Sequence, residues 1–262
     1  MFADKGVDIE LLDVRTTIFD FSSPLPPEID HCSLILERAV SFSKGCYALQ
    51  VLESKGKKTL NTSALLELCG DKIKTSLLLE KSGIPTLKTY LALSPESALE
   101  AIEKMGYPVV LKPPVGSWGR LLAKINDKDS AEAVIEHKST LGSYQHELFY
   151  IQEYVKKPGR DIRVVVVGDK PIAAMYRNSA HWITNAARGG MPERCPITQD
   201  IKKITDQVIN TFGEGLMGID LFETNDGLKV VEVNAGVEFK AISRVSENNI
   251  PEKIVDYAIS LA

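Results

Sequence analysis

The stretch 216–240, LMGIDLFETNDGLKVVEVNAGVEFK, limits the fold of this chain because it reads as two strands joined by a tight turn. Apolar and polar residues alternate on both sides of the Asn-Asp-Gly turn at 225–227, a pattern that predicts a β-hairpin. The hairpin would set Asp220 near Glu232, and the two-residue period puts Glu232 and Asn234 on one face. Two carboxylates and an amide oxygen suit Mg²⁺, which usually adds substrate phosphates to such ligands. A hairpin whose polar residues simply face water fits the spacing as well.

The composition is that of an ordinary globular protein: 262 residues, 44% hydrophobic and 25% charged, enough for two or three small lobes. The net charge of −4 gives no reason to expect a nucleic-acid partner. No apolar run approaches the roughly 18 residues of a membrane-spanning helix. The cysteines, Cys32, Cys46, Cys69 and Cys195, lack any Cys-x-x-Cys pair, which indicates buried thiols in a reducing compartment. With no secretion signal at the start, we expect a cytoplasmic protein.

The first part of the chain predicts a small βαβ lobe and hence an α/β fold, because strand and helix patterns alternate there. Its opening residues read as the last turn of a helix with Gly6 as C-cap, followed by a strand over Val7–Leu12. A parallel α/β lobe normally opens with a strand and then a helix, so we expect this lobe to lack its first strand. A short strand over Lys58–Leu60 then leads into a helix capped within 61–63.

Two lysines and a glycine-rich loop mark the next part of the chain. Lys72 falls in the first turn of a predicted helix, and a strand over Tyr107–Leu111 delivers Lys112. The following loop begins at Gly116, and glycine lets backbone N–H groups approach an anion while lysine adds positive charge. The loop is neither a Walker loop nor a Rossmann fingerprint. A phosphate site and a plain hairpin turn beside solvated lysines both fit.

A polar segment, 152–155, ends a predicted strand just before a Lys-Pro-Gly bend, and Asp161 and Arg163 begin the next strand. Backbone beside a carboxylate can hold an adenine edge and a ribose, although the spacing alone favours an antiparallel meander with charged edges. A polar, glycine-rich loop over 181–196 follows, and such loops often carry substrate sites. Its histidine, His181, has no Ser or Cys partner at a telling spacing, so a catalytic triad is not indicated.

Taken in order, these features form a family pattern. The segments are GDK at 70–72, VVLKP at 109–113, GSWGR at 116–120, QEYV at 152–155, GRDIR at 159–163, ARGG at 187–190, and Asp220 with Glu232-x-Asn234. From about residue 30 onward this layout resembles the ATP-grasp ligases, and within them the RimK-like branch. The run 149–190 and the segment EVNAGVEFK resemble the LysX enzymes, which join 2-aminoadipate to the carrier protein LysW. The resemblance implies three lobes, which we place at 1–70, 71–150 and 151–262, with ATP between the last two.

The resemblance also implies roles for individual residues. ATP would contact Lys72, Lys112, the loop Gly116, Ser117, Trp118, Gly119, Arg120, Leu121 and Leu122, the adenine segment Gln152, Glu153, Tyr154 and Val155, the ribose residue Asp161, and Arg163, Arg177 and Asn185. Catalysis would use Arg188, Lys112 and Asn185, and two Mg²⁺ ions would bind Asp220, Glu232 and Asn234. The substrates would contact His181, Trp182, Arg188, Glu238, Phe239, Ala241 and Ile242.

The activity implied is ATP-dependent amide formation on a LysW-type acidic carrier. The pair Ala241-Ile242 departs from the Gly-Phe pair of glutamate-specific relatives and favours 2-aminoadipate. Glutamate, dual specificity, a RimK-type ligase acting on another acceptor, and a nucleotide-binding regulator without catalysis remain alternatives. Lys156, Lys157 and Arg160 are candidates for docking the carrier, although a solvated turn explains them equally. Family members are often homo-oligomers, so we expect one here.

Overall fold

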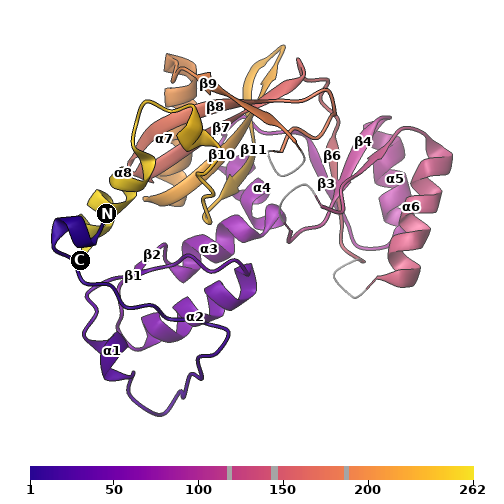
Figure 1. Cartoon of the computed structure of the whole chain (residues 1–262). Coiled ribbons are helices and arrows are strands. Elements are labelled where there is room, and N and C mark those ends of the chain that lie inside the picture. Colours follow the sequence, from indigo (N-terminus) through magenta and orange to yellow (C-terminus); the bar gives the residue numbers. More distant parts are fainter. Residues whose placement is uncertain (117–119, 143–146, 186–188) are drawn as a thin grey trace.

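The computed structural model describes residues 1–116, 120–142, 147–185 and 189–262 (Figure 1). Within these ranges the strands form a 2-stranded sheet β1-β2, a 4-stranded sheet β3-β6-β4-β5 and a 5-stranded sheet β11-β10-β7-β8-β9. Helices pack on each sheet, so the chain has the mixed α/β character predicted for it. None of the helices in this part of the chain is both long and apolar enough to cross a membrane.

The N-terminal lobe is a βαβ unit. Its elements are η1 (Ala3–Lys5), α1 (Pro27–Asp30), β1 (Ile35–Leu36), α2 (Phe42–Ser54), β2 (Thr59–Leu60) and α3 (Ser63–Gly70). Strands β1 and β2 are parallel, and Gly6 caps η1 in the left-handed conformation. The strand predicted over Val7–Leu12 is wrong: these residues form no ladder, and Leu11 is 93% exposed. An extended segment becomes a strand only where a neighbour shares its backbone hydrogen bonds, and β1 pairs only with β2 in the described structure.

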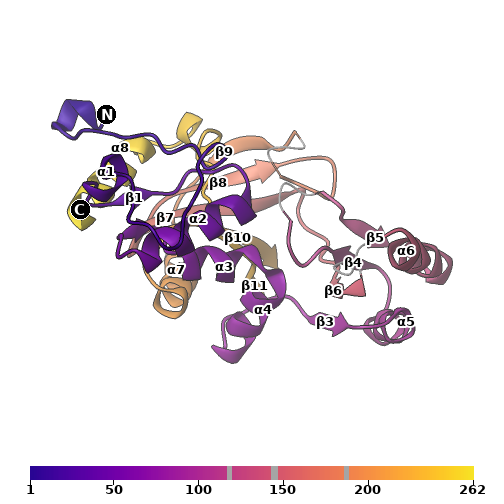
Figure 2. The same cartoon turned by 90° about the horizontal axis from the view of Figure 1, so that it is seen from below.

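The central lobe stacks two helices on its sheet. Its elements are α4 (Lys72–Lys81), β3 (Thr89–Ala92), α5 (Pro95–Met105), β4 (Val109–Lys112), β5 (Ala123–Ile125), α6 (Lys128–Leu141) and β6 (Phe149–Glu153). Ser94 and Asp127 start α5 and α6 with capping boxes, as serine and aspartate do at such positions. Figures 1 and 2 place this sheet, with α5 and α6, at one end of the molecule. Strand β6 ends at Glu153, so the sheet extends past the division predicted at 150.

The C-terminal lobe has a helix on each side of its sheet. Its elements are β7 (Arg160–Gly168), β8 (Lys170–Asn178), β9 (Met191–Cys195), α7 (Gln199–Phe212), β10 (Gly215–Thr224), β11 (Gly227–Asn234), η4 (Ile242–Arg244) and α8 (Ile250–Leu261). Helices α7 and α8 contribute to different hydrophobic clusters. The end of the polar loop predicted over 181–196 is instead strand β9, paired with β8. Its Pro192 and exposed side chains suit an edge strand and hide it from pattern reading.

The predicted hairpin is confirmed as β10 and β11. Asp220 lies opposite Glu232, and Gly218 lies opposite Asn234. On its other side β10 pairs with β7, where Arg163 lies opposite Asp220. The hairpin therefore brings the polar residues of three neighbouring strands to one region of the sheet.

Asn61 joins the N-terminal lobe to this sheet. Its Nδ2 donates to the carbonyl oxygens of Leu216 at 2.8 Å and Ala235 at 2.6 Å, and Leu216 N donates to its Oδ1 at 2.7 Å. The side chain is only 5% exposed. Every polar atom of the amide is therefore used to dock the lobe beside the end of β11, as burial of an amide requires.

Replacing Gly215 with alanine should weaken this docking. A Cβ there would lie 2.5 Å from Asn61 Oδ1 and 2.8 Å from Leu65 Cδ2, so one of them must move. We expect a loss of about 1–3 kcal/mol in the free energy of unfolding, the usual range for overpacking, measured by urea denaturation. Gly236→Ala is the control, because its Cβ would meet nothing within 4 Å. Equal stability of the two variants would contradict the docking role of Asn61.

Candidate functional site

A cavity lies between the four-stranded and five-stranded sheets, and residues of both sheets line it. Most of the residues assigned to the nucleotide line it: Lys72, Lys112, Gly116, Arg120, Leu122, Gln152, Glu153, Tyr154, Val155, Asp161, Arg177 and Asn185. Asp220 and Glu232 line it too, with apolar side chains from Leu87, Val110, Phe222 and Val231. The fold therefore gathers residues from both sheets around one space, which we call the first cavity.

Two lysines approach the first cavity from the central lobe. Lys72 Nζ donates to Gly116 O at 2.6 Å and lies 3.4 Å from Glu232 Oε1. Its own backbone N–H donates to Pro114 O at 2.9 Å, which ties the start of α4 to the loop. Lys112 Nζ donates to Gln152 Oε1 at 2.6 Å, and burial lowers the pKa of Lys112 to about 8. Positive charge is thus concentrated at the Glu232 end of the cavity.

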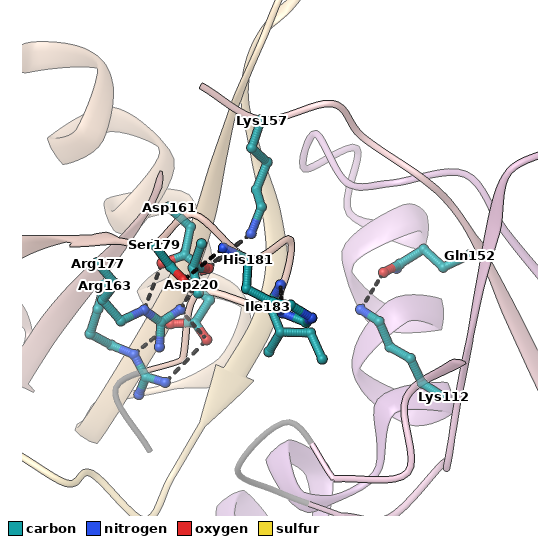
Figure 3. Close-up of polar contacts among 11 residues, drawn as sticks. Lys112, Gln152, Lys157, Asp161, Arg163, Arg177, Ser179, His181, Ile183 and Asp220 are labelled. Carbon is teal, nitrogen blue, oxygen red and sulfur yellow. Dashed lines mark hydrogen bonds and ion pairs between the residues drawn. The ribbon is translucent and has the colours of Figure 1, made fainter. Parts of the chain in front are cut away.

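Gln152 positions Lys112. The glutamine is 1% exposed, and its Nε2 donates to Thr89 Oγ1 at 3.2 Å and to the Tyr150 hydroxyl at 3.1 Å. In Figure 3 the Lys112–Gln152 pair lies apart from a cluster of aspartate and arginine side chains, and Asp161, Arg177 and Asp220 of that cluster line the same cavity as the pair. Both ends of the Gln152 amide are bonded to protein, so its side chain serves the lysine and does not point freely into the cavity.

The cluster opposite is built around Asp220. Arg163 Nε lies 2.5 Å from Asp220 Oδ1, and Arg177 Nη2 lies 3.0 Å from Oδ2 (Figure 3). Burial alone would raise the pKa of the Asp220 carboxyl, but Arg163 and Arg177 together hold it below its usual value. Burial likewise opposes the charge of Arg177, yet Asp220 and Asp161 raise its pKa further. Asp220 is therefore a carboxylate at neutral pH, although it is almost fully buried.

Asp161, like Asp220, is surrounded by donors from the protein itself. Arg177 donates to its two oxygens at 2.6 Å and 2.9 Å, Thr184 Oγ1 also donates to it, and Lys157 Nζ lies 3.8 Å away. The carrier-docking role predicted for Lys157 is wrong, because its side chain is only 8% exposed and lies 4.4 Å over the Phe222 ring. A lysine beside a buried aspartate is drawn inward by that charge, which a sequence pattern of consecutive lysines does not reveal.

The three residues predicted to hold Mg²⁺ come together, and their donor set fits the ion. Asp220 and Glu232 face each other across the ladder, and Asn234 Nδ2 donates to Gly218 O at 3.5 Å. Asp220 Oδ1 is buried and lies 2.5 Å from Arg163 Nε, but no aligned hydrogen bond reaches it from the described residues. Neither here nor elsewhere in the described ranges do three acidic, histidine or cysteine side chains gather, so this site rests on two carboxylates and one amide. Two carboxylates and one amide leave coordination positions for phosphate oxygens, as Mg²⁺ sites usually do.

Two aromatic side chains, Tyr154 and Trp182, also line the first cavity. The rings of Tyr154 and Trp182 are 6.4 Å apart in an edge-to-face arrangement, and Lys124 Nζ lies 3.8 Å over Tyr154. The structure therefore places Trp182, which we predicted for the amino-acid substrate, with the residues predicted for adenine. His181 is exposed and accepts from Ile183 N at 3.0 Å, so it shapes the local turn.

A second cavity, with an empty volume of about 1340 Å³, adjoins the first, and Gly116, Asn185 and Glu232 line both. Arg163, Asn234 and Glu238 line only the second. Ile242 is fully buried, Ala241 and Phe239 pack against the same core cluster as Ile242, and none of the three lines either cavity. Leu121 is 74% exposed and lines neither.

Ser117, Trp118, Gly119 and Arg188 lie outside the described residues.

Three features of the site were not predicted from the sequence: the bond from Thr184 to Asp161, the buried position of Lys157, and the glycine at 218. A Cβ on Gly218 would overlap the guanidinium of Arg163, so glycine at this strand position leaves room for that arginine beside Asp220. A glycine inside a predicted strand, two residues before a candidate ligand, is the signal that indicates such a close approach.

Comparison with known proteins agrees with this geometry. Residues 69–258 match the RimK-like ATP-grasp domain, and residues 1–68 match the LysX preATP-grasp domain. The glutamate–LysW ligase ArgX of Sulfurisphaera tokodaii is 34% identical over 257 residues, which cover 97% of this chain and 90% of ArgX. The α-aminoadipate–LysW ligase LysX of Saccharolobus solfataricus is 35% identical over 227 residues, covering 86% and 82%.

The fold comparison points the same way. The crystal structure of a RimK domain ATP-grasp protein from Sphaerobacter thermophilus has a TM-score of 0.82 at 24% identity, and the match covers 98% of this chain and 92% of that one. The ATP-grasp fold that the sequence predicted is thereby confirmed. Since the family domain spans most of the chain and the match covers 90% of ArgX and 82% of LysX, the chain belongs to the RimK-like ATP-grasp ligases.

Proposed function

We propose that this ligase joins the side-chain carboxylate of the C-terminal glutamate of a LysW-type carrier to the α-amino group of 2-aminoadipate. The observation that carries the proposal is the meeting of the two cavities at Glu232, Asn185 and Gly116. A nucleotide in the first cavity and an acyl acceptor in the second would come together there. The match to the LysX preATP-grasp domain and the LysW ligases among the relatives supply the substrate class.

The chemistry needs two successive transfers. The carrier carboxylate attacks the γ-phosphorus of ATP, ADP leaves, and an acyl phosphate forms. The α-amine then attacks the acyl carbon, inorganic phosphate leaves, and the amine gives up a proton as the amide forms. Neither step requires an enzyme nucleophile; both need positioning and charge compensation.

The residues around the meeting point suit these needs. Lys72 and Lys112 would hold phosphate oxygens, and their positive charges would offset the charge that develops on the transferred group. Asp220, Glu232 and Asn234 would hold Mg²⁺, which supplies further charge neutralisation on the phosphates. Two ions are our expectation. Arg188, predicted to act in catalysis, lies outside the described residues and keeps that role as a proposal.

Glutamate is the second candidate amino acid, because the relatives include both a glutamate ligase and an aminoadipate ligase at nearly equal identity. The pair Ala241-Ile242 favours 2-aminoadipate by its departure from the Gly-Phe pair. Since both residues lie outside the two cavities, this pair would act through the packing of the segment that follows Asn234.

The test is an assay of ADP release with a purified LysW-type carrier and each amino acid in turn. We expect turnover that requires the carrier and is faster at low concentrations of 2-aminoadipate than of glutamate. Turnover with glutamate alone would exclude our preferred amino acid. Turnover that does not need the carrier would exclude the carrier and favour another acceptor.

Lys112 gives nucleotide binding a pH dependence. Burial lowers its pKa to about 8 in the free protein, so the lysine is charged below that pH and neutral above it. Affinity for MgADP should be constant below pH 8 and fall above it, by up to about tenfold per pH unit for one proton. Calorimetric titration across this range measures the effect. Lys112→Arg should remove the decline, because arginine stays charged; an unchanged decline would assign it to another group.

A further inference from the structure

The second cavity is walled by all three lobes. Its residues come from the stretch after β1, from α3, from the loop at Gly116, and from the segment that follows β11. Glu232 and Asn234 line it, and so does Arg38 of the N-terminal lobe. The cavity thus shares Glu232 with the first cavity and has a cation from the N-terminal lobe.

Arg38 is held in a defined position. Its Nη1 donates to Val237 O at 3.0 Å, and its guanidinium lies 5.2 Å over the Phe239 ring. Val237 is 2% exposed, and Phe239 packs against the core cluster that contains Ile242. These two contacts restrain the guanidinium although Arg38 is an exposed residue, so less side-chain entropy is lost on binding a ligand than for an unrestrained arginine.

No carboxylate of the described residues forms an ion pair with Arg38. Three acidic side chains line the cavity, and each has a contact of its own. Glu232 pairs with Lys72 at 3.4 Å, and Glu238 Oε1 accepts from Lys240 N at 2.7 Å. Glu37 Oε1 accepts from Ala39 N at 2.7 Å, and its charge interacts with Arg38 without a direct ion pair. The other arginine of the cavity, Arg163, is paired with Asp220. Arg38 therefore has guanidinium N–H groups left for an anion that enters the cavity.

We infer that Arg38 binds a carboxylate of an acidic amino-acid unit in the second cavity and so determines which substrate is accepted. Its planar donors match a carboxylate in two parallel hydrogen bonds. The inference rests on the proposed function, which requires such a unit next to the transferred phosphoryl group. Two sources share this chemistry: the free amino acid and the C-terminal glutamate of the carrier.

Replacing Arg38 with glutamine tests the inference, because glutamine keeps a polar side chain with an amide donor but carries no charge. We expect the KM of the substrate that supplies the carboxylate to rise about 10- to 100-fold, as for loss of a charge-assisted pair. The KM for ATP should stay within about twofold, because Arg38 does not line the first cavity. Arg38→Lys should recover part of the affinity by restoring the charge. A rise for the amino acid assigns the site to it, and a rise for the carrier assigns it to the terminal glutamate.

Competition by substrate analogues distinguishes carboxylate binding by Arg38 from a purely structural role of this residue. In the wild type, 4-aminobutyrate lacks the α-carboxylate of glutamate, and 2-aminobutyrate lacks the distal one, so each should compete less well than glutamate. In Arg38→Gln, the penalty for the carboxylate that Arg38 binds should disappear while the other remains. Equal penalties in both proteins, with neither KM changed, would overturn the inference.

Arg194→Gln is the matched control, since this exposed arginine on β9 pairs with Glu247 and lies outside both cavities. It should leave every KM within about twofold. If the wild type fails to turn over with the carrier and either amino acid, the proposed function fails. A wild type that turns over, with Arg38→Gln indistinguishable from it, overturns only the role of Arg38.

Discussion

Glu232→Gln should lower turnover by about 10³-fold while leaving the fold intact, because amide replaces carboxylate without a change of shape. The lost charge lies where the two cavities meet, 3.4 Å from Lys72 Nζ. It also belongs to the proposed Mg²⁺ site, where removal of a charged ligand leaves the phosphates poorly neutralised. ADP formation at saturating substrate, together with thermal unfolding of the variant, measures both parts of this expectation.

Glu223→Gln provides the comparison on the same hairpin. Glu223 lies on β10 and accepts from Arg160 at 2.7 Å and 2.9 Å, outside both cavities. Its loss should change turnover by less than about threefold, as for other surface ion pairs. Unchanged turnover in Glu232→Gln would refute the metal role of Glu232, and a stable but inactive Glu223→Gln would show that the hairpin responds to any charge loss.

Arg177→Met should cost about 3–5 kcal/mol of stability, the range for breaking a buried ion pair. Arg177 is 4% exposed and is shared between two buried carboxylates, with Asp161 at 2.6 Å and Asp220 at 3.0 Å. Methionine matches the apolar stem but supplies no donors, so Asp161 loses its main cationic partner and Asp220 loses one of its two arginines. Urea denaturation measures the loss. Arg160→Met, which removes a half-exposed pair with Glu223, should cost no more than about 1 kcal/mol.

The Arg177→Met effect should depend on pH. The pKa of Asp220 is lowered in the folded protein, so the stability that its charge contributes is present at neutral pH and is lost as pH falls through its folded-state pKa. The difference between wild type and Arg177→Met should therefore shrink under acid conditions, since Asp220 can then be protonated. A difference that stays constant down to the acid transition would show that packing, and not charge, is what Arg177 contributes.

Local patterns predicted the hairpin well because both of its determinants are local. The alternation of apolar residues and the Asn-Asp-Gly turn fix the register, and the register places Asp220 opposite Glu232. Capping residues such as Ser94 and Asp127 are local in the same sense, because a cap uses only the next few residues. Strand β9 was missed because an exposed edge strand with a proline carries no alternating apolar signal.

The nucleotide residues were predictable as a set but not in their individual contacts. Family-like segments marked Gln152 and Asp161, yet the structure turns the side chain of Gln152 toward Lys112 and surrounds Asp161 with Arg177, Thr184 and Lys157. These partners come from separate strands and loops. The packing of whole lobes decides which polar side chains form hydrogen bonds with each other. The spacing of residues in the sequence does not encode these pairs.

The sequence by itself determined the hairpin, the alternating α/β lobes and the order of segments that identifies the family. Only the tertiary structure decided that two cavities meet at Glu232 and that Arg38, from the N-terminal lobe, lines the second of them. It also placed Ala241 and Ile242 in the packed core of the C-terminal lobe. The physical reason is that the side-chain periodicity of strands and helices depends on residues close together in the chain. Cavities arise where residues distant in sequence are packed together.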